Sequence, residues 1–309
     1  MDSLLCSVEE LHALLARDAT RAPFVSSGHE PPAVRVLDLR WAPSGPSARE
    51  RYLAGHIPGA LFADLDRDLS NAQPRGPGGR HPMVSPEQLA AALSRWGIGE
   101  ETQVIFYDDG SGAIAARGWF QLRLHGHAKV RLLDGGLWAW KEAGLPLETT
   151  EAHAAAAPRR TLTRDESRLV DRKRIERFVS ERHEGQPGTG PILLDARAPE
   201  RYRGDVEPID PIAGHIPGAK NLPFASFLRG GGAPGGDPRW RSPGELRALL
   251  DARGLRGREL IASCGSGVTA CHILAALEQA GYPEAKLYGG SYSDWVSVPG
   301  APVEKGDLT

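Results

Sequence analysis

The chain has 309 residues, too many for one ordinary hydrophobic core, and its length fits two domains of about 150 residues each. Hydrophobic residues make up 40% and charged residues 25% of the chain, as in ordinary globular proteins. The formal net charge of −2 excludes a bulk attraction to nucleic acid or to an anionic membrane surface.

The amino-terminal stretch MDSLLCSVEELHALLARD has acidic residues from position 2 and no long apolar run, so we expect no secretory signal. No stretch approaches the roughly 18 apolar residues that span a bilayer, so we expect no membrane partner. Three cysteines (Cys6, Cys264 and Cys271) are too few, and odd in number, for a disulfide framework. We therefore predict that the cysteines are free thiols and that the protein works in a reducing compartment, the cytoplasm.

Five landmarks of the first half recur in the same order in the second half. Matching positions are a nearly constant distance apart: Asp38 and Asp195 are separated by 157 residues, and Asp108 and Cys264 by 156. This regularity predicts an internal duplication. The first set is VRVLDLR (34–40), YLAGHIPGALFADL (52–65), SPEQLAAAL (85–93), VIFYDDGSG (104–112) and LLDGGLWAW (132–140). The second set is ILLDAR (192–197), IAGHIPGAKNLPF (212–224), SPGELRALL (242–250), LIASCGSGVTA (260–270) and LYGGSYSDW (287–295).

Each half alternates short β-branched runs with helical patterns, which indicates βαβ units. The predicted fold class is therefore α/β, with each half forming a mainly parallel sheet flanked by helices on both faces. Two helices should begin at Ser85 and Ser242, because each serine precedes a proline at the first helical position.

The stretch 151–168 lacks a strand pattern and predicts a linker between an amino-terminal domain, 1–150, and a carboxyl-terminal domain, 169–309. The glycine- and proline-rich stretches 73–82 and 229–238 lie inside these domains and predict surface loops.

Cys264 follows the apolar run Leu260–Ser263 and opens the loop Cys-Gly-Ser-Gly-Val-Thr, before a helical run at Ala270–Ala280. A strand, a glycine-bearing turn and a helix start direct backbone N–H groups toward one point. Such a cradle stabilises a thiolate or a persulfide anion. The alternative is a small buried core residue at a strand end. The predicted cradle residues are Gly265, Gly267, Val268 and Thr269.

The glycines of this loop permit a positive φ and a close backbone approach, and Ser266 and Thr269 add hydroxyl donors. The position that matches Cys264 in the first half is Asp108. We therefore predict that the amino-terminal domain is non-catalytic and that the chemistry of Cys264 occurs once per chain.

The duplicated layout, the two GHIPGA segments and the loop CGSGVTA together resemble the tandem rhodanese family of sulfurtransferases, from about residue 5 to residue 304. The loop is most similar to the 3-mercaptopyruvate type, since the thiosulfate type usually has basic residues directly after the cysteine. The resemblance implies two rhodanese-like domains, a persulfide on Cys264 and a first domain without the cysteine.

The resemblance also implies substrate-binding residues. Arg201 matches a substrate-binding arginine of the family, while the place of its second arginine is held by Ile209. Ser266 matches a hydroxyl residue that works with a histidine, and His56 matches that histidine. The alternatives are a solvated surface arginine for Arg201 and, for His56 as for its twin His215, a structural histidine holding a turn.

Two neighbouring residues have structural interpretations. Arg197 should pair with a carboxylate beside the sheet, and Cys271 should belong to the core of the following helix. No cluster of cysteine and histidine has metal-ligand spacing, so we expect no metal and no cofactor.

The predicted function is transfer of a sulfane sulfur from 3-mercaptopyruvate, through a persulfide on Cys264, to a thiol or cyanide acceptor, with thioredoxin among the candidate acceptors. Gly265 and Ser266 are neutral, which favours a monocarboxylate over the compact dianion thiosulfate. We further expect the site to lie between the two halves.

Three alternatives remain. The first is a thiosulfate:cyanide sulfurtransferase. The second is a non-catalytic rhodanese-like binding module, which typically has lost the cysteine. The third is a phosphatase of the Cdc25 type, whose loop needs an arginine where this chain has Ala270.

Overall fold

The computed structural model describes residues 3–21, 32–42, 44–71, 78–183, 190–282 and 285–307, which form two compact units. Unit 1 takes its described residues from 1–71, 84–164 and 237–240. Unit 2 takes its described residues from 72–83, 165–236 and 241–309. Each unit therefore contains a short segment from the opposite half of the sequence.

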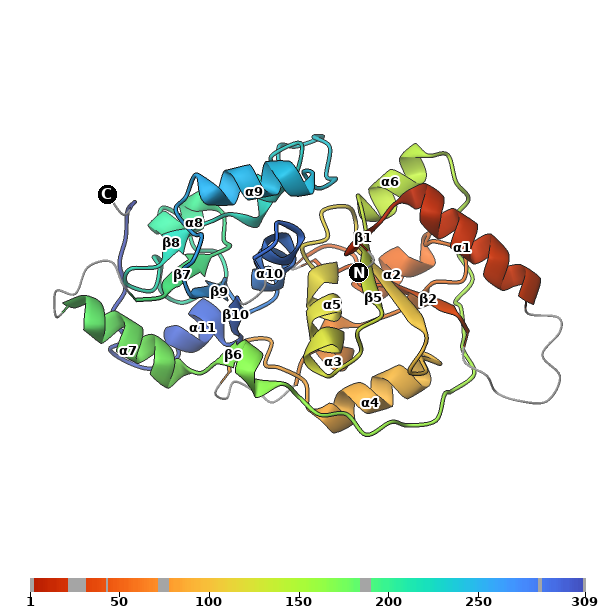
Figure 1. Cartoon of the computed structure of the whole chain (residues 1–309), viewed down its shortest axis with the longest axis horizontal. Helices are drawn as coiled ribbons and strands as arrows, with labels where there is room; N and C mark the ends of the chain where they lie inside the picture. Colours follow the sequence, from red (N-terminus) through yellow and green to blue (C-terminus); the bar gives the residue numbers. More distant parts are fainter. Residues whose placement is uncertain are drawn as a thin grey trace. The chain divides into compact units, whose positions relative to one another are not determined.

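Unit 1 is built on a five-stranded sheet of order β1-β5-β4-β2-β3, in which every strand pair is parallel. Figure 1 shows α1 and α5 on opposite sides of this sheet. The elements are β1 (Leu5–Cys6), α1 (Val8–Arg21), β2 (Val34–Asp38), α2 (Ala48–Leu53), β3 (Leu61–Phe62), α3 (Leu65–Asp68), α4 (Pro86–Arg95), β4 (Gln103–Tyr107), α5 (Ala115–Leu124), β5 (Val130–Leu133) and α6 (Gly136–Glu142).

Unit 2 has a five-stranded parallel sheet of order β6-β10-β9-β7-β8. Figure 1 shows α7 and α10 on opposite sides of it. The elements are η2 (Glu166–Arg168), β6 (Leu169–Val170), α7 (Arg172–His183), β7 (Ile192–Asp195), α8 (Pro199–Arg203), β8 (Lys220–Asn221), η3 (Phe224–Phe227), α9 (Pro243–Asp251), β9 (Leu260–Ser263), α10 (Ala270–Gln279), β10 (Lys286–Tyr288) and α11 (Ser291–Trp295).

The two sheets have the same topology when the strands are matched in chain order, β1 with β6 through β5 with β10. This equivalence confirms the duplication and the predicted parallel α/β fold. The central strands β4 and β9 are buried along their length except for Gln103, as expected for a parallel sheet covered on both faces.

The helix starts follow the predicted capping chemistry. Ser85 caps α4 by accepting a hydrogen bond from the Gln88 N–H, and Ser242 caps α9 by accepting one from the Glu245 N–H. Glu245 bonds back to the Ser242 backbone and completes a capping box. Both helices therefore begin where the Ser-Pro pairs predicted.

The described end of the predicted surface loop 73–82 contains no helix or strand, as expected, but it is not wholly at the surface. Residues 73–77 lie outside the described residues, while 78–83 belong to unit 2. There the Gly78 N–H donates to Asp294 Oδ1 at 2.9 Å, and the Arg80 N–H donates to Ser293 Oγ at 3.1 Å. His81, in the same segment, is buried. The loop prediction for 229–238 holds at residues 231–235, which are exposed.

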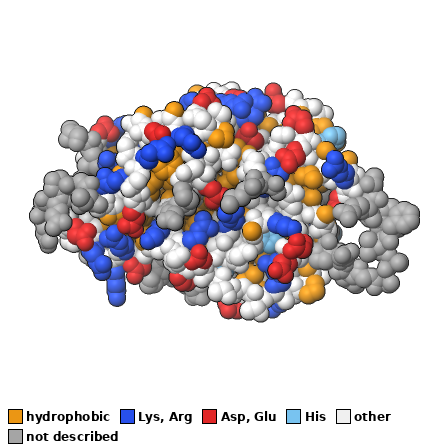
Figure 2. Space-filling view, in the orientation of Figure 1, with side chains coloured by type: hydrophobic (Ala, Val, Ile, Leu, Met, Phe, Trp, Pro, Cys, Tyr) orange, Lys and Arg blue, Asp and Glu red, His pale blue; other side chains and the backbone are white. Residues whose placement is uncertain are grey.

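Charged side chains of both signs are interspersed over the face seen in Figure 2, in keeping with the small net charge. Within the described ranges, the structure contains no helix with the length and apolar character needed to cross a bilayer.

Candidate active site

Cys264 lies at the carboxyl end of β9, between strands β10 and β7 of unit 2. Ligand sites of parallel α/β sheets form at this edge, where the loops after the strands meet. Only 2% of the Cys264 surface is exposed. The loop that follows rises directly into α10, which begins at Ala270 as predicted.

The backbone of the loop curls around the sulfur atom. The Gly267 N–H donates to Cys264 Sγ at 3.1 Å. Gly267 has a φ of +75°, and a Cβ there would lie 2.2 Å from the Gly289 carbonyl oxygen, so only glycine fits. Gly265 lies outside the left-handed region, but a Cβ there would lie 2.9 Å from Arg80 Nη2. The predicted positive φ and close backbone approach are therefore confirmed for Gly267, whereas Gly265 has neither, since its nearest neighbours are arginine side chains.

The last residues of the loop connect it to α10. Val268 is buried, and Thr269 is the N-cap residue of the helix. Cys271, in the first turn, is fully buried and donates its thiol hydrogen to the Gly267 carbonyl oxygen at 3.2 Å. The prediction that Cys271 belongs to the core is confirmed, and its thiol also supports the loop. All three cysteines of the chain are buried thiols.

A second turn, at the start of α11, holds the Cys264 loop by its backbone. The Cys264 N–H donates to Ser291 Oγ at 3.0 Å, and Ser291 Oγ donates to the Tyr288 carbonyl oxygen at 2.9 Å. The Tyr292 N–H donates to the Cys264 carbonyl oxygen at 2.9 Å. Among the described residues, Ser291 is the one non-glycine with a positive φ, 52°. Such strain persists where surrounding contacts fix the conformation.

Ser266 has a histidine partner that the sequence reasoning missed. Its Oγ lies 2.8 Å from His81 Nδ1, and both side chains are largely buried. His81 lies in the part of unit 2 that comes from residues 72–83, and it falls within the predicted surface loop 73–82. The available signal was a histidine inside a glycine-rich connection, the kind of segment that often carries functional residues.

Arg201 projects from α8 toward the same loop. Its Nη2 lies 3.7 Å from the position of a Cβ on Gly265. The guanidinium pairs with Glu207 Oε1 at 2.6 Å and with Asp210 Oδ2 at 3.3 Å, and 18% of the side chain is exposed. The alternative of a solvated surface arginine is therefore wrong, and Arg201 lies beside Gly265.

Arg80 is a second guanidinium at this loop. It forms an ion pair with Asp210, whose other oxygen contacts Arg201. Burial raises the pKa of Asp210, although Arg80 and Arg201 both act to lower it. Positive charge therefore adjoins the neutral Gly265 from outside the loop.

Arg197 confirms its structural interpretation. The guanidinium pairs with Asp195 at 2.7 Å, donates to the Gly214 carbonyl oxygen at 2.8 Å and stacks over the Tyr292 ring. It thus ties the end of β7 to the turn that holds Cys264.

His56 belongs to unit 1 and is fully buried in a turn. Its ring stacks on Tyr52 with centroids 3.8 Å apart, and its Nδ1 lies 2.9 Å from the Tyr52 carbonyl oxygen. His215 repeats both contacts with Tyr202, at 3.8 Å and 2.8 Å. Because the two histidines have the same environment, the structural alternative accounts for His56, and we do not retain it as a substrate-binding residue.

The loop of unit 1 that matches the Cys264 loop holds a carboxylate in place of the sulfur. The Asp108 side chain accepts hydrogen bonds from the backbone N–H groups of Gly110, Gly112 and Ile114 at 2.9 Å and of Ala115 at 3.2 Å. Burial raises the pKa of Asp108, and these donors oppose that rise. The cradle of the first half is thus filled by its own side chain.

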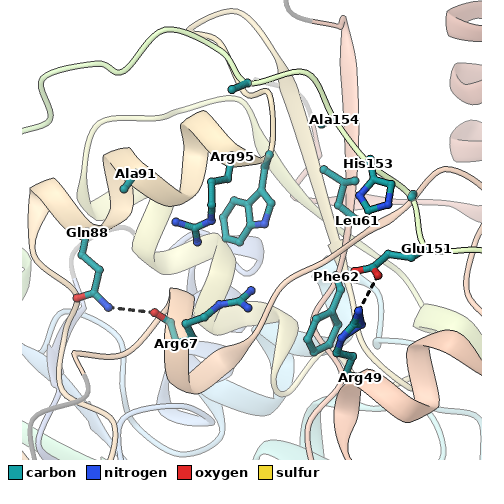
Figure 3. Close-up of a pocket in the computed structure, with 13 residues that line it drawn as sticks. Arg49, Leu61, Phe62, Arg67, Gln88, Ala91, Arg95, Glu151, His153 and Ala154 are labelled. Carbon is teal, nitrogen blue, oxygen red and sulfur yellow. Dashed lines mark hydrogen bonds and ion pairs between the residues drawn. The ribbon is translucent and has the colours of Figure 1, made fainter.

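Unit 1 also contains a cavity of about 830 Å³ between α2, α4 and the chain after α6 (Figure 3). Its arginines have partners: Arg49 pairs with Glu151 at 2.6 Å, and Arg67 and Arg95 pair with the buried Asp68 at 2.8 and 2.7 Å. None of the predicted site residues lines this cavity. We assign it no catalytic role.

Comparison with known proteins assigns both halves of the chain to the same domain family. Residues 22–143 and 179–298 each match the profile of the rhodanese-like domain. The "Probable 3-mercaptopyruvate sulfurtransferase" of Pseudomonas aeruginosa is 48% identical over 281 residues, covering 89% of this chain and 94% of that protein. Thiosulfate sulfurtransferase of Bos taurus is 33% identical and covers 92% of both chains.

Among solved structures, SseA from Escherichia coli, described as a 3-mercaptopyruvate sulfotransferase, superposes with a TM-score of 0.75. It is 28% identical, and the match covers 94% of this chain and 100% of that one. The similarity therefore extends over both units.

Proposed function

This chain belongs to the family of sulfurtransferases with two rhodanese-like domains, and we propose that it carries sulfur from 3-mercaptopyruvate as a persulfide on Cys264. The surroundings of the sulfur support this role for Cys264, because the Gly267 N–H and the start of α10 both stabilise an anion there. Gly265, Gly267, Val268 and Thr269 shape the cradle.

In the first half-reaction the Cys264 thiolate attacks the sulfur of the donor. A new S–S bond forms, the C–S bond breaks, and its electron pair leaves with carbon as the enolate of pyruvate. Arg201 would hold the donor carboxylate by a charge-assisted hydrogen bond.

The observation that carries the choice of donor is the Ser266–His81 hydrogen bond of 2.8 Å beside the cysteine loop. An enolate must take up a proton, which Ser266 can donate while His81 replaces it from Nδ1. Sulfite, the leaving group of thiosulfate, needs no such proton. This pair therefore favours 3-mercaptopyruvate.

In the second half-reaction a thiolate or cyanide attacks the outer sulfur of the persulfide, and the Cys264 thiolate is released. The electron pair of the acceptor forms the new bond to the outer sulfur, and the electron pair of the broken S–S bond stays on Cys264. No external reductant is therefore needed for this step. A small thiol, cyanide or a dithiol protein such as thioredoxin would each satisfy this chemistry.

A specific observation also supports thiosulfate as the second candidate donor. Arg80 and Arg201 both lie beside Gly265, and paired cations suit a dianion. The deciding experiment is the ratio of kcat/KM for 3-mercaptopyruvate and thiosulfate, with cyanide as the acceptor. A ratio above one supports the first donor, and a ratio below one supports the second.

The amino-terminal domain, 1–150, is proposed to be non-catalytic, with 151–168 as the linker and 169–309 as the catalytic domain. The closed Asp108 loop supports this division, since no sulfur nucleophile lies at the end of β4. The three buried thiols are compatible with the reducing cytoplasm, where we propose that the protein works.

A further inference from the structure

Arg80 is held close to the Cys264 loop by contacts of its own segment. A Cβ on Gly79 would lie 2.4 Å from the Gly290 carbonyl oxygen, so the chain passes directly against the turn before α11. The Arg80 N–H donates to Ser293 Oγ at 3.1 Å, and the Ser293 N–H donates to the Gly265 carbonyl oxygen at 2.8 Å. The backbone of Arg80 is thus connected to Gly265 through one residue.

The side chain of Arg80 also faces this loop. Its Nη2 lies 2.9 Å from the position of a Cβ on Gly265, nearer than either Nη atom of Arg201, at 3.7 and 3.8 Å. Gly265 directly follows Cys264, so both guanidiniums adjoin the residue next to the reactive sulfur. About a third of the Arg80 side chain is exposed, at 32%, so a ligand can reach it.

Asp210 contacts both guanidiniums, one with each carboxylate oxygen. Its side chain is 1% exposed, and its backbone N–H donates to Glu207 Oε1 at 3.1 Å. A carboxylate that joins two guanidiniums has the geometry by which such a pair would hold the carboxylate of a ligand. Asp210 therefore competes with an anionic donor for the same cations.

We propose that Arg80 is a donor-binding residue of this site, which recognises the anionic group of the sulfur donor together with Arg201, and that Asp210 weakens this recognition by competing for Arg80. This inference rests on the proposed function, since it concerns the same site. The second positively charged side chain of the site, Arg80, would then come from the first half of the sequence.

The experiment compares wild type, Arg80→Ala, Asp210→Asn and the double variant carrying both changes. One readout is KM and kcat for 3-mercaptopyruvate with cyanide. The other is the ratio of rates at which iodoacetate and iodoacetamide alkylate Cys264. The two reagents differ in one carboxylate, so their ratio reports attraction of an anion to the loop without any sulfur transfer.

Arg80→Ala should raise KM about 10-fold or more, as expected for a lost charge-assisted hydrogen bond, and change kcat much less. The iodoacetate preference should fall in parallel. Asp210→Asn should lower KM and raise that preference, because Arg80 loses its competing partner. Arg203→Ala is the matched control, since Arg203 lies on α8 and pairs with the exposed Asp205.

The double variant distinguishes binding of the donor by Arg80 from mere neutralisation of Asp210 by Arg80. If Arg80 only neutralises the buried Asp210, removing both charges restores the wild-type KM and alkylation ratio, which would overturn the inference. If Arg80 binds the donor, both defects persist in the double variant. If no donor transfers sulfur to wild-type Cys264, the proposed function fails, while the alkylation ratio still decides the role of Arg80.

Discussion

The loops after β4 and β9 occupy the same place in two sheets of the same topology, yet they are built around different groups. In unit 1 the Asp108 carboxylate accepts N–H donors from Gly110, Gly112, Ile114 and Ala115. In unit 2 the Gly267 N–H points at the Cys264 sulfur. Unit 1 therefore encloses a carboxylate of its own chain at the place where unit 2 holds a cysteine sulfur.

The turns at the starts of α6 and α11, which lie beside these two loops, also differ in one residue. Gly136, at the start of α6, has a φ of +50°, and Ser291, at the start of α11, has a φ of 52°. Only the serine supplies a hydroxyl, and it accepts the Cys264 N–H. Unit 2 thus keeps a strained residue where unit 1 uses glycine, which indicates that positioning of the cysteine outweighs the cost of the strain.

The largest effect should come from removing the sulfur. Cys264→Ser should lower sulfur transfer by on the order of 10⁴-fold or more, because the nucleophile is lost while the loop is retained. Mass spectrometry after exposure to donor should detect one added sulfur atom on wild type and none on the variant. Cys271→Ala is the control and should still form the persulfide, although its loop loses one hydrogen bond. Turnover surviving in Cys264→Ser would contradict the assignment.

The next effect tests whether the Cys264 loop needs its proton donor. His81→Ala should lower kcat/KM for 3-mercaptopyruvate about 100-fold, the usual size of a general-acid contribution, and should affect thiosulfate far less. The measurement is the ratio of the two donors in each variant. His56→Gln is the control: it disturbs a buried turn, so it should lower stability and leave that ratio unchanged. Equal losses for both donors in His81→Ala would reject a proton-transfer role.

A smaller effect is expected when the occupied cradle is emptied. Asp108→Ala leaves buried N–H groups without their acceptor and should lower the free energy of unfolding of unit 1 by about 2–4 kcal/mol. Hydrogen exchange at the amides of Gly110 and Gly112 should become much faster. Persulfide formation on Cys264 should persist at temperatures where unit 1 remains folded. Unchanged exchange at these amides would show that the carboxylate does not hold the loop.

The smallest effect concerns the strained serine. Ser291→Ala loses the acceptor for the Cys264 N–H and keeps the strain, so unit 2 should lose about 1 kcal/mol of stability. Ser291→Gly loses the same hydrogen bond but relieves the strain, so its stability should lie closer to wild type. Denaturation of both variants measures the difference. A glycine variant less stable than the alanine variant would show that no strain is stored there.

Much of the fold was predictable because it depends on local patterns repeated twice. The Ser-Pro helix starts at Ser85 and Ser242, the strand Leu260–Ser263 and the helix from Ala270 all lie where the residues predicted. The loop of Cys264 was predictable for the same reason, since strand, glycines and helix are consecutive in the sequence.

The partners of that loop were not predictable, because they depend on contacts between distant segments. His81 lies 185 residues before Ser266, and Arg80 lies 130 residues before Asp210. The repeat also misled the choice of histidine: His56 occupies a conspicuous position because it supports a turn present in both units. A pattern shared by both halves of the chain indicates structure more strongly than catalysis.

Each unit contains a short segment from the opposite half of the sequence, so one half of the chain cannot be transplanted as a complete unit. A cut anywhere in 151–165 would separate His81 from Ser266 in one unit. The same cut would separate Trp240 from Asp134, whose carboxylate accepts its backbone N–H at 2.9 Å, in the other. A transplanted fragment 165–309 would carry the cysteine without its histidine. The boundary of the repeat lies near the middle of the sequence, but Ser266 and its partner His81 come from opposite sides of that boundary.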